Sequence, residues 1–156
     1  MGLFREFFII IGALNKRDLQ YTVVGGIALA FHHEPRFTRN IDILAKPADL
    51  PVYEGVFSSL GYFKTGEPWT FLKTNITLHR FAKHSVEDED ELLIIDLLIG
   101  HEARHEAVIL NSLTDDSRAG SVRVATKDDL IWMKKIRASK QDEADIENLE
   151  GRHEQD

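Results

Sequence analysis

The chain has 156 residues, enough for one domain with a sizeable core, and its 43% hydrophobic and 29% charged content excludes wholesale disorder. The formal net charge of -7 disfavours a broad nucleic-acid surface, because such surfaces rely on many Lys and Arg side chains. There is no cysteine, which excludes disulfides and thiolate metal sites and is compatible with the cytoplasmic location that we expect. We expect one domain over residues 1–150 and a polar tail over 151–156.

The first half of the chain predicts a helix, a strand, a glycine turn and a second helix. Apolar residues at helical spacing near the N-terminus predict an amphipathic helix, and their run is too short to span a membrane, so no membrane partner is expected; they are Leu3, Phe7, Ile10, Ile11 and Leu14. Residues 21–24 form a short apolar run that ends at Gly25 and Gly26. Residues 27–31 then suit a helix.

The middle of the chain predicts further strands around one helix. Residues 40–45 alternate polar and apolar side chains, as a strand with one solvated or functional face does. The remaining elements expected here are a helix over 48–60, short strands at 63, 69–73 and 76–81, and a buried strand over 92–99.

The C-terminal part predicts a helix over 102–110, a strand over 121–125 and one or two helices from about residue 128 to the late 140s. Thr126 is the expected N-cap of the last helical segment. The order of elements indicates an α/β (α+β) fold in which a mixed sheet is flanked by helices.

The buried strand over 92–99 contains one carboxylate, Asp96. An ionised Asp in an apolar strand is costly unless it is paired, hydrogen-bonded or bound to a metal. Asn40 and Asp42 share one face of their own strand, so they converge on Asp96 if the two strands are neighbours. Clustered oxygen ligands suit Mg²⁺, and the glycine turn offers backbone N–H groups to a phosphate. Taken singly, the glycine pair also fits a plain tight turn, and Asp42 a surface or capping residue.

Three motifs in this order resemble the minimal nucleotidyltransferase (DNA polymerase beta-like) superfamily. They are the segments 23–28 (VVGGIA), 36–44 (RFTRNIDIL) and 94–98 (IIDLL). The segment 124–134 and the residues Asp142 and Asp145 are similar to the bacterial branch that includes the AbiEii-type toxins. The resemblance spans residues 21–149 and implies the nucleotidyltransferase fold.

The resemblance also implies roles for individual residues. Gly25 and Gly26 would contact the triphosphate, and Asp42 and Asp96 would be catalytic carboxylates that bind Mg²⁺. Lys134 would reach the nucleotide, with a plain helix-surface lysine as the alternative. The residues Arg36, Thr38 and Arg39 would bind phosphate or orient the acceptor, unless they are ordinary exposed loop residues.

The implied reaction is attack of an acceptor hydroxyl on the α-phosphate of a nucleoside triphosphate, with pyrophosphate as the leaving group. The acceptor would be an RNA, a protein or a small molecule. Asn40 departs from the pattern, because it stands where a metal carboxylate is expected: its carbonyl oxygen can still bind the metal with Asp42 and Asp96, but it brings no charge. A nucleotide-binding protein without turnover, such as one half of a toxin–antitoxin pair, is therefore an alternative hypothesis.

A different metal motif lies at residues 101–105, where the sequence HEARH matches the H-E-x-x-H pattern of zinc peptidases. Its position directly after a strand puts His101 at or before the helix start, and a third ligand would have to come from a distant segment. A solvated helix face is the alternative that we prefer.

Overall fold

The computed structural model describes residues 2–33, 38–85, 90–117 and 120–137. Arg36, Asp142, Asp145 and the expected polar tail lie outside the described residues. The helices are α1 Gly2–Lys16, α2 Gly25–Phe31, α3 Leu50–Ser59, α4 Ala103–Leu110 and α5 Lys127–Arg137, with a short 3₁₀ turn at Pro47–Asp49. The strands are β1 Tyr21–Val24, β2 Asn40–Ala45, β3 Phe63–Lys64, β4 Trp69–Phe71, β5 Ile76–His84, β6 Leu92–Gly100, β7 Leu113–Ser117 and β8 Gly120–Val124.

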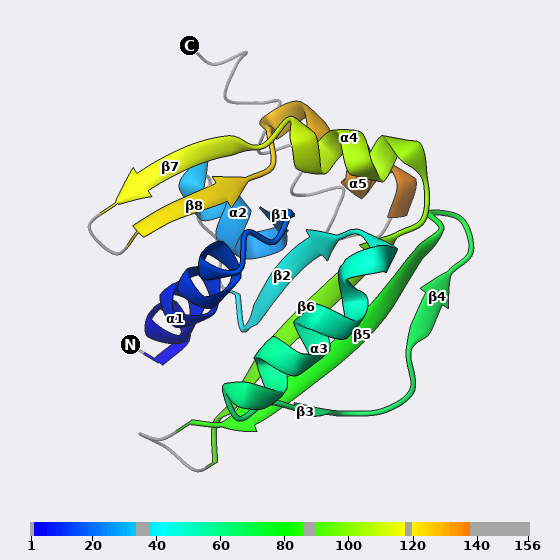
Figure 1. Cartoon of the computed structure of the whole chain (residues 1–156). Helices are drawn as coiled ribbons and strands as arrows, with labels where there is room; N and C mark the ends of the chain where they lie inside the picture. Colours follow the sequence, from blue (N-terminus) through cyan, green and yellow to red (C-terminus); the bar gives the residue numbers. More distant parts are fainter. Residues whose placement is uncertain (1, 34–37, 86–89, 118–119, 138–156) are drawn as a thin grey trace.

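The described strands form one mixed, eight-stranded sheet in the order β3-β5-β6-β2-β1-β8-β7, with β4 paired to β5 (Figure 1). The pairs β2–β6 and β1–β8 are parallel, and the other pairs are antiparallel. Helices pack on this sheet, so the predicted mixed sheet flanked by helices is confirmed. The long strand β6 lies between β2 and β5, which explains its nearly continuous apolar sequence.

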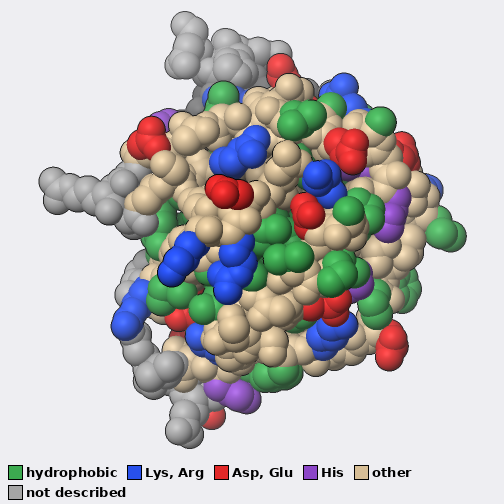
Figure 2. Space-filling model, in the orientation of Figure 1, with side chains coloured by type: hydrophobic (Ala, Val, Ile, Leu, Met, Phe, Trp, Pro, Cys, Tyr) green, Lys and Arg blue, Asp and Glu red, His purple; other side chains and the backbone are tan. Residues whose placement is uncertain are grey.

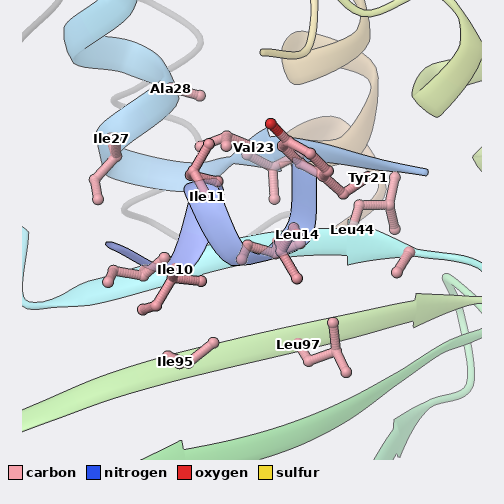
Figure 3. Packing of buried hydrophobic residues seen from close by; sticks show 14 of the residues in the cluster. Ile10, Ile11, Leu14, Tyr21, Val23, Ile27, Ala28, Leu44, Ile95 and Leu97 are labelled. Carbon is pink, nitrogen blue, oxygen red and sulfur yellow. The ribbon is translucent and has the colours of Figure 1, made fainter. Parts of the chain in front are cut away.

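The helices α1 and α3 cover one face of the sheet. The predicted apolar face of α1 is confirmed: Phe7, Ile10, Ile11 and Leu14 are buried, and Leu3 packs at the edge of the core. Figure 3 shows Ile10, Ile11 and Leu14 of α1 beside the strands β1, β2 and β6. Within the described residues, no helix is both long and apolar enough to cross a membrane.

The opposite face of the sheet carries the polar side chains. Along β1, Tyr21 hydrogen-bonds to Asn15 near the end of α1, whereas the next residue, Thr22, accepts a hydrogen bond from Ser112 just after α4. Side chains alternate between faces along a strand, so α1 and α4 lie on opposite sides. In β2, Asn40 and Asp42 therefore face away from the buried Ile41 and Ile43, as their alternation predicts.

One strand was not predicted, several boundaries differ, and the two glycines predicted as a turn are the first residues of α2. β7 has the sequence LTDDS, which lacks an apolar alternation, and it becomes a strand through its antiparallel pairing with β8. The predicted helix over 48–60 starts with the 3₁₀ turn, so its α-helical part begins at Leu50. β4 stops at Phe71, and β5 extends to His84 because it pairs with the full length of β6.

Thr126 caps the last described helix, as predicted, by accepting a hydrogen bond from the backbone N–H of Asp129 at 3.1 Å. We expect Thr126→Ala to lower the free energy of unfolding by about 1 kcal/mol, because the exchange removes the partner of an otherwise unpaired N–H group. Urea unfolding followed by circular dichroism measures this change. Thr126→Ser keeps the hydroxyl and should change it by a few tenths of a kcal/mol only, and equal losses for both variants would contradict the capping role.

Candidate functional site

A row of charged side chains crosses three neighbouring strands. Asp42 on β2 is the direct partner of Asp96 on β6, and Arg80 on β5 is the direct partner of Asp96 on the other side. Directly paired residues project from the same face of a sheet, so all three side chains lie on the polar face. The strands β2 and β6 are neighbours, as the expected convergence of Asn40, Asp42 and Asp96 required.

Asp96 is 6% exposed, and three hydrogen bonds reach its carboxylate. The Arg80 guanidinium donates from Nε to Oδ1 at 2.7 Å and from Nη2 to Oδ2 at 3.0 Å. The Asn40 amide donates from Nδ2 to Oδ2 at 2.9 Å. The hydrogen bonds from Arg80 to Asp96 raise the pKa of Arg80 above its usual value, more than its partial burial lowers it. The sequence required a partner for the buried carboxylate of Asp96. Side chains of the protein itself supply this partner.

The two glycines that begin α2, directly after β1, are packed against the site. Gly25 has φ +72°, and a Cβ atom there would lie 2.0 Å from Oδ2 of Asp42. A Cβ atom on Gly26 would lie 2.7 Å from the Thr38 Cβ. Only glycine lets the chain pass this close to the two side chains. Gly25 lines the adjoining pocket, whereas Gly26 lies behind Thr38 and is not part of the lining.

A pocket of about 410 Å³ opens beside this row. Its charged lining consists of three cations and two carboxylates, namely Arg39, Arg80, Lys134, Asp42 and Asp96. Lys134, from α5, is only 5% exposed. The apolar lining is formed by Phe71, Ile76, Leu78, Leu98, Leu130 and Met133. Of the predicted site residues, the structure thus gathers Gly25, Thr38, Arg39, Asn40, Asp42, Asp96 and Lys134 around one cavity.

Arg80 is the residue that the sequence did not reveal. It belongs to a segment, Ile76–His84, in which polar and apolar residues follow no motif of the resemblance. The only sequence signal is that a buried Asp needs a partner, and that requirement does not say which of the chain's 19 Lys and Arg residues supplies it.

The contacts of Asp96 decide how well the site fits a metal ion. Mg²⁺ needs several oxygen ligands at near-octahedral positions. A carboxylate only accepts hydrogen bonds, so Asn40 turns its NH₂ group, and not its oxygen, toward Asp96. Arg80 places a positive charge on the same carboxylate. Asn40, Asp42 and Asp96 do not fit as a shared Mg²⁺ shell in this arrangement, and the expected Mg²⁺ stays a prediction.

The residues of the HEARH segment hold the start of α4. Glu102 is the N-cap, its carboxylate accepts from the backbone of His105, and its own N–H donates to His105 Nδ1 at 3.2 Å. His101 lies before the helix, and its Nε2 is 2.7 Å from the Thr77 hydroxyl. Among the described residues, no three His, Asp or Glu side chains are grouped so as to hold a metal ion. A zinc peptidase is therefore not favoured, and the preferred solvated face is wrong for His105, which is 1% exposed.

No protein-family model matches the sequence, and no curated protein matches it. Solved structures are nevertheless similar. A putative nucleotidyltransferase from Thermotoga maritima, TM1012, superposes with a TM-score of 0.63 at 12% identity, over 98% of this chain and 93% of that one. This chain has the nucleotidyltransferase fold.

Two further structures with the nucleotidyltransferase fold are antibiotic-related proteins. The antibiotic-resistance factor ANT(2'')-Ia matches with a TM-score of 0.58 at 15% identity, over 96% of this chain and 84% of that one. The lincosamide antibiotic adenylyltransferase LnuA, solved with lincomycin bound, matches with a TM-score of 0.58 at 13% identity, over 94% and 95%. The nucleotidyltransferase fold is shown by these similarities, while the finer resemblance to AbiEii-type toxins stays a prediction.

The close contact between Gly25 and Asp42 predicts a large effect of a single methyl group. We expect Gly25→Ala to lower the free energy of unfolding by about 2 kcal/mol or more, because the positive φ disfavours alanine and its Cβ would overlap the carboxylate. Gly12→Ala is the matched control: it lies in α1 with no atom within 4 Å of the added Cβ, and should raise stability by up to about 1 kcal/mol. Chemical denaturation of both variants measures these opposite signs, and equal effects would contradict the proposed packing.

Burial lowers the pKa of His105 below its ordinary value of 6.5, against the opposing effect of Glu102. The unfolded chain then binds a proton that the folded chain refuses, so the free energy of unfolding should fall as the pH drops below about 6.5. We expect His105→Asn to flatten this fall between about pH 8 and about pH 5.5 in thermal melts. His79, whose pKa is also lowered by burial, contributes in the same direction, so the slope should shrink without vanishing. An unchanged slope would contradict a neutral, buried His105.

Proposed function

We propose that this chain is a nucleotidyltransferase that binds a nucleoside triphosphate in the 410 Å³ pocket and transfers its nucleotide to a hydroxyl acceptor. The observation that carries the proposal is the position of Asp42 and Asp96, which lie opposite each other on the neighbouring strands β2 and β6. Both line a pocket that Gly25 and three cationic side chains also line. The nucleotidyltransferase fold supports the same reaction class.

The phosphates are the part of the nucleotide that the charged lining suits. Arg39, Arg80 and Lys134 outnumber the two carboxylates of the pocket, although the whole chain carries a formal charge of -7. Cationic side chains bind phosphate oxygens through short, charge-assisted hydrogen bonds. Gly25 adds a part of the lining without a side chain, and Thr38 lines the pocket as well.

In the proposed transfer, the acceptor oxygen bonds to the α-phosphorus while the bond to the pyrophosphate oxygen breaks. The acceptor proton passes to a carboxylate. We assign this role to Asp42, because it lines the pocket beside Gly25 and the cationic side chains. Asp96 then holds Arg80 in place, and the cations of the pocket stabilise the negative charge that gathers on the phosphoryl oxygens.

A small-molecule acceptor fits the chain better than RNA does. The net charge of -7 disfavours a polyanionic acceptor. On the face in Figure 2, Lys and Arg side chains are interspersed with Asp and Glu and form no continuous basic surface. The apolar lining from Phe71 to Met133 suits a compact organic molecule or a base. The structural similarity to LnuA, a lincosamide antibiotic adenylyltransferase, also supports a small-molecule acceptor.

A second candidate function is nucleotide binding without turnover, including the expected role in a toxin–antitoxin pair. Asn40 favours it, because an amide stands where the resemblance implies a carboxylate and donates to Asp96. The two candidates share the pocket and the nucleotide, and they differ only in the release of pyrophosphate.

Release of pyrophosphate decides between them. The purified chain, incubated with each labelled nucleoside triphosphate and a set of hydroxylated small molecules, with and without Mg²⁺, should release pyrophosphate. Asp42→Asn should reduce the rate by about 100-fold or more, as expected for loss of a general base. The matched control is Asp115→Asn, an exposed residue of β7 that should leave the rate unchanged.

The outcomes separate the two hypotheses. Nucleotide binding without pyrophosphate release by the unmodified chain would support the second candidate. Absence of release from both the unmodified chain and Asn40→Asp would reject nucleotidyl transfer.

A further inference from the structure

The ion pair at Asp96 sits where the resemblance implies a metal ion. The carboxylate accepts two hydrogen bonds from the guanidinium of Arg80 and one from the amide of Asn40. Both partners come from β2 and β5, the strands that flank β6. The register of the sheet therefore fixes their positions more firmly than a loop would. A guanidinium in a bidentate pair is a fixed positive charge with a fixed direction.

Arg80 also reaches the cavity. Its side chain is 45% exposed and lines the pocket, while that of Asp96 is 9% exposed. A guanidinium has five N–H donors, and Asp96 takes Nε and one donor of Nη2. The remaining donors point away from the carboxylate and can meet a phosphate oxygen. The guanidinium therefore connects a buried anion on one side to the pocket on the other.

Asn40 completes this arrangement. With a carboxylate at position 40, the pocket would hold three anions beside three cations, and the new anion would repel Asp96 and compete for Arg80. The neutral amide leaves an excess of one positive charge in the described lining. It also donates to Asp96, which a carboxylate cannot do.

We propose that Arg80, held by Asp96 and Asn40, takes the place of a bound metal ion as the fixed cation of this pocket, so that nucleotide phosphates bind without a divalent cation. This inference rests on the nucleotide binding proposed above. A nucleoside triphosphate without bound metal carries a dense negative charge, and Arg39, Arg80 and Lys134 supply the compensation that Mg²⁺ otherwise supplies.

The test is the affinity for ATP in excess EDTA and in excess Mg²⁺, measured by isothermal titration calorimetry. We expect the unmodified chain to bind in EDTA with a Kd within about threefold of that in Mg²⁺, since the fixed cation is present in both. Arg80→Gln should weaken binding in EDTA at least about tenfold, because a charge-assisted hydrogen bond to phosphate is lost. Asn40→Asp should weaken binding in EDTA and make it depend on Mg²⁺.

The matched control is Arg104→Gln. Arg104 also pairs with a buried aspartate, Asp129, and is 53% exposed, but it does not line the pocket. It should leave the Kd unchanged in both solutions. Arg80→Lys keeps the charge without the bidentate geometry and should recover part of the affinity in EDTA, which separates an effect on binding from an effect on folding.

Binding by the unmodified chain only in Mg²⁺ would overturn the inference and leave the proposed function in place. Binding of Arg80→Gln in EDTA as tightly as the unmodified chain would overturn it as well. Failure of the unmodified chain to bind ATP, GTP, CTP or UTP in either solution would reject the proposed function and this inference together.

Discussion

The carboxylate of Asp96 is the constraint around which the site is arranged. It lies in the middle of the buried strand β6, where an unpaired negative charge would be strongly unfavourable. The pairing of β6 with β5 brings Arg80 to it, and the pairing with β2 brings Asn40 and Asp42. The carboxylate of Asp96 therefore helps to fix the register of both β2 and β5 against β6, in addition to the apolar side chains of these strands. A slip of one residue in β2 would turn Asn40 and Asp42 into the core.

The site and the core are two consequences of the same alternation. In β2, Ile41 and Ile43 are buried in the core while Asn40 and Asp42 face the pocket. The chain that follows β1 can pass beside Asp42 only because Gly25 has no side chain. The helix α5, which Thr126 caps, then closes the pocket with Lys134. Packing of the core thus positions each charged side chain of the pocket. The charged side chains themselves lie on the face of the strands that the core does not occupy.

The sequence predicted the fold well where one strong local signal was present. The apolar spacing of α1, the N-X-D alternation of β2 and the apolar run of β6 each correspond to an observed element, and the glycine pair marks the start of α2. β7 was not predicted because its residues, LTDDS, have no local preference for a strand and depend on β8. Arg80 was not predicted for a related reason: it acts through a pairing across strands, and sequence spacing does not encode that pairing. In the HEARH segment the metal site was rightly not preferred, but the preferred solvated face was wrong for His105, which is buried at the capped start of α4.

The residues that line the pocket range in sequence from Val24 to Lys134 and include residues of β2, β5 and β6. The residues that it brings together are thus separated by many tens of positions, so loop-closure entropy must be overcome before the pocket exists. A partly folded chain, or a fragment without β6, lacks the contacts between Asp96, Arg80 and Asn40. We therefore expect no smaller form of the pocket in such a chain. A ligand of this pocket therefore acts on the lifetime of the complete fold, because it binds after the long-range strand pairings have formed and must leave before they separate.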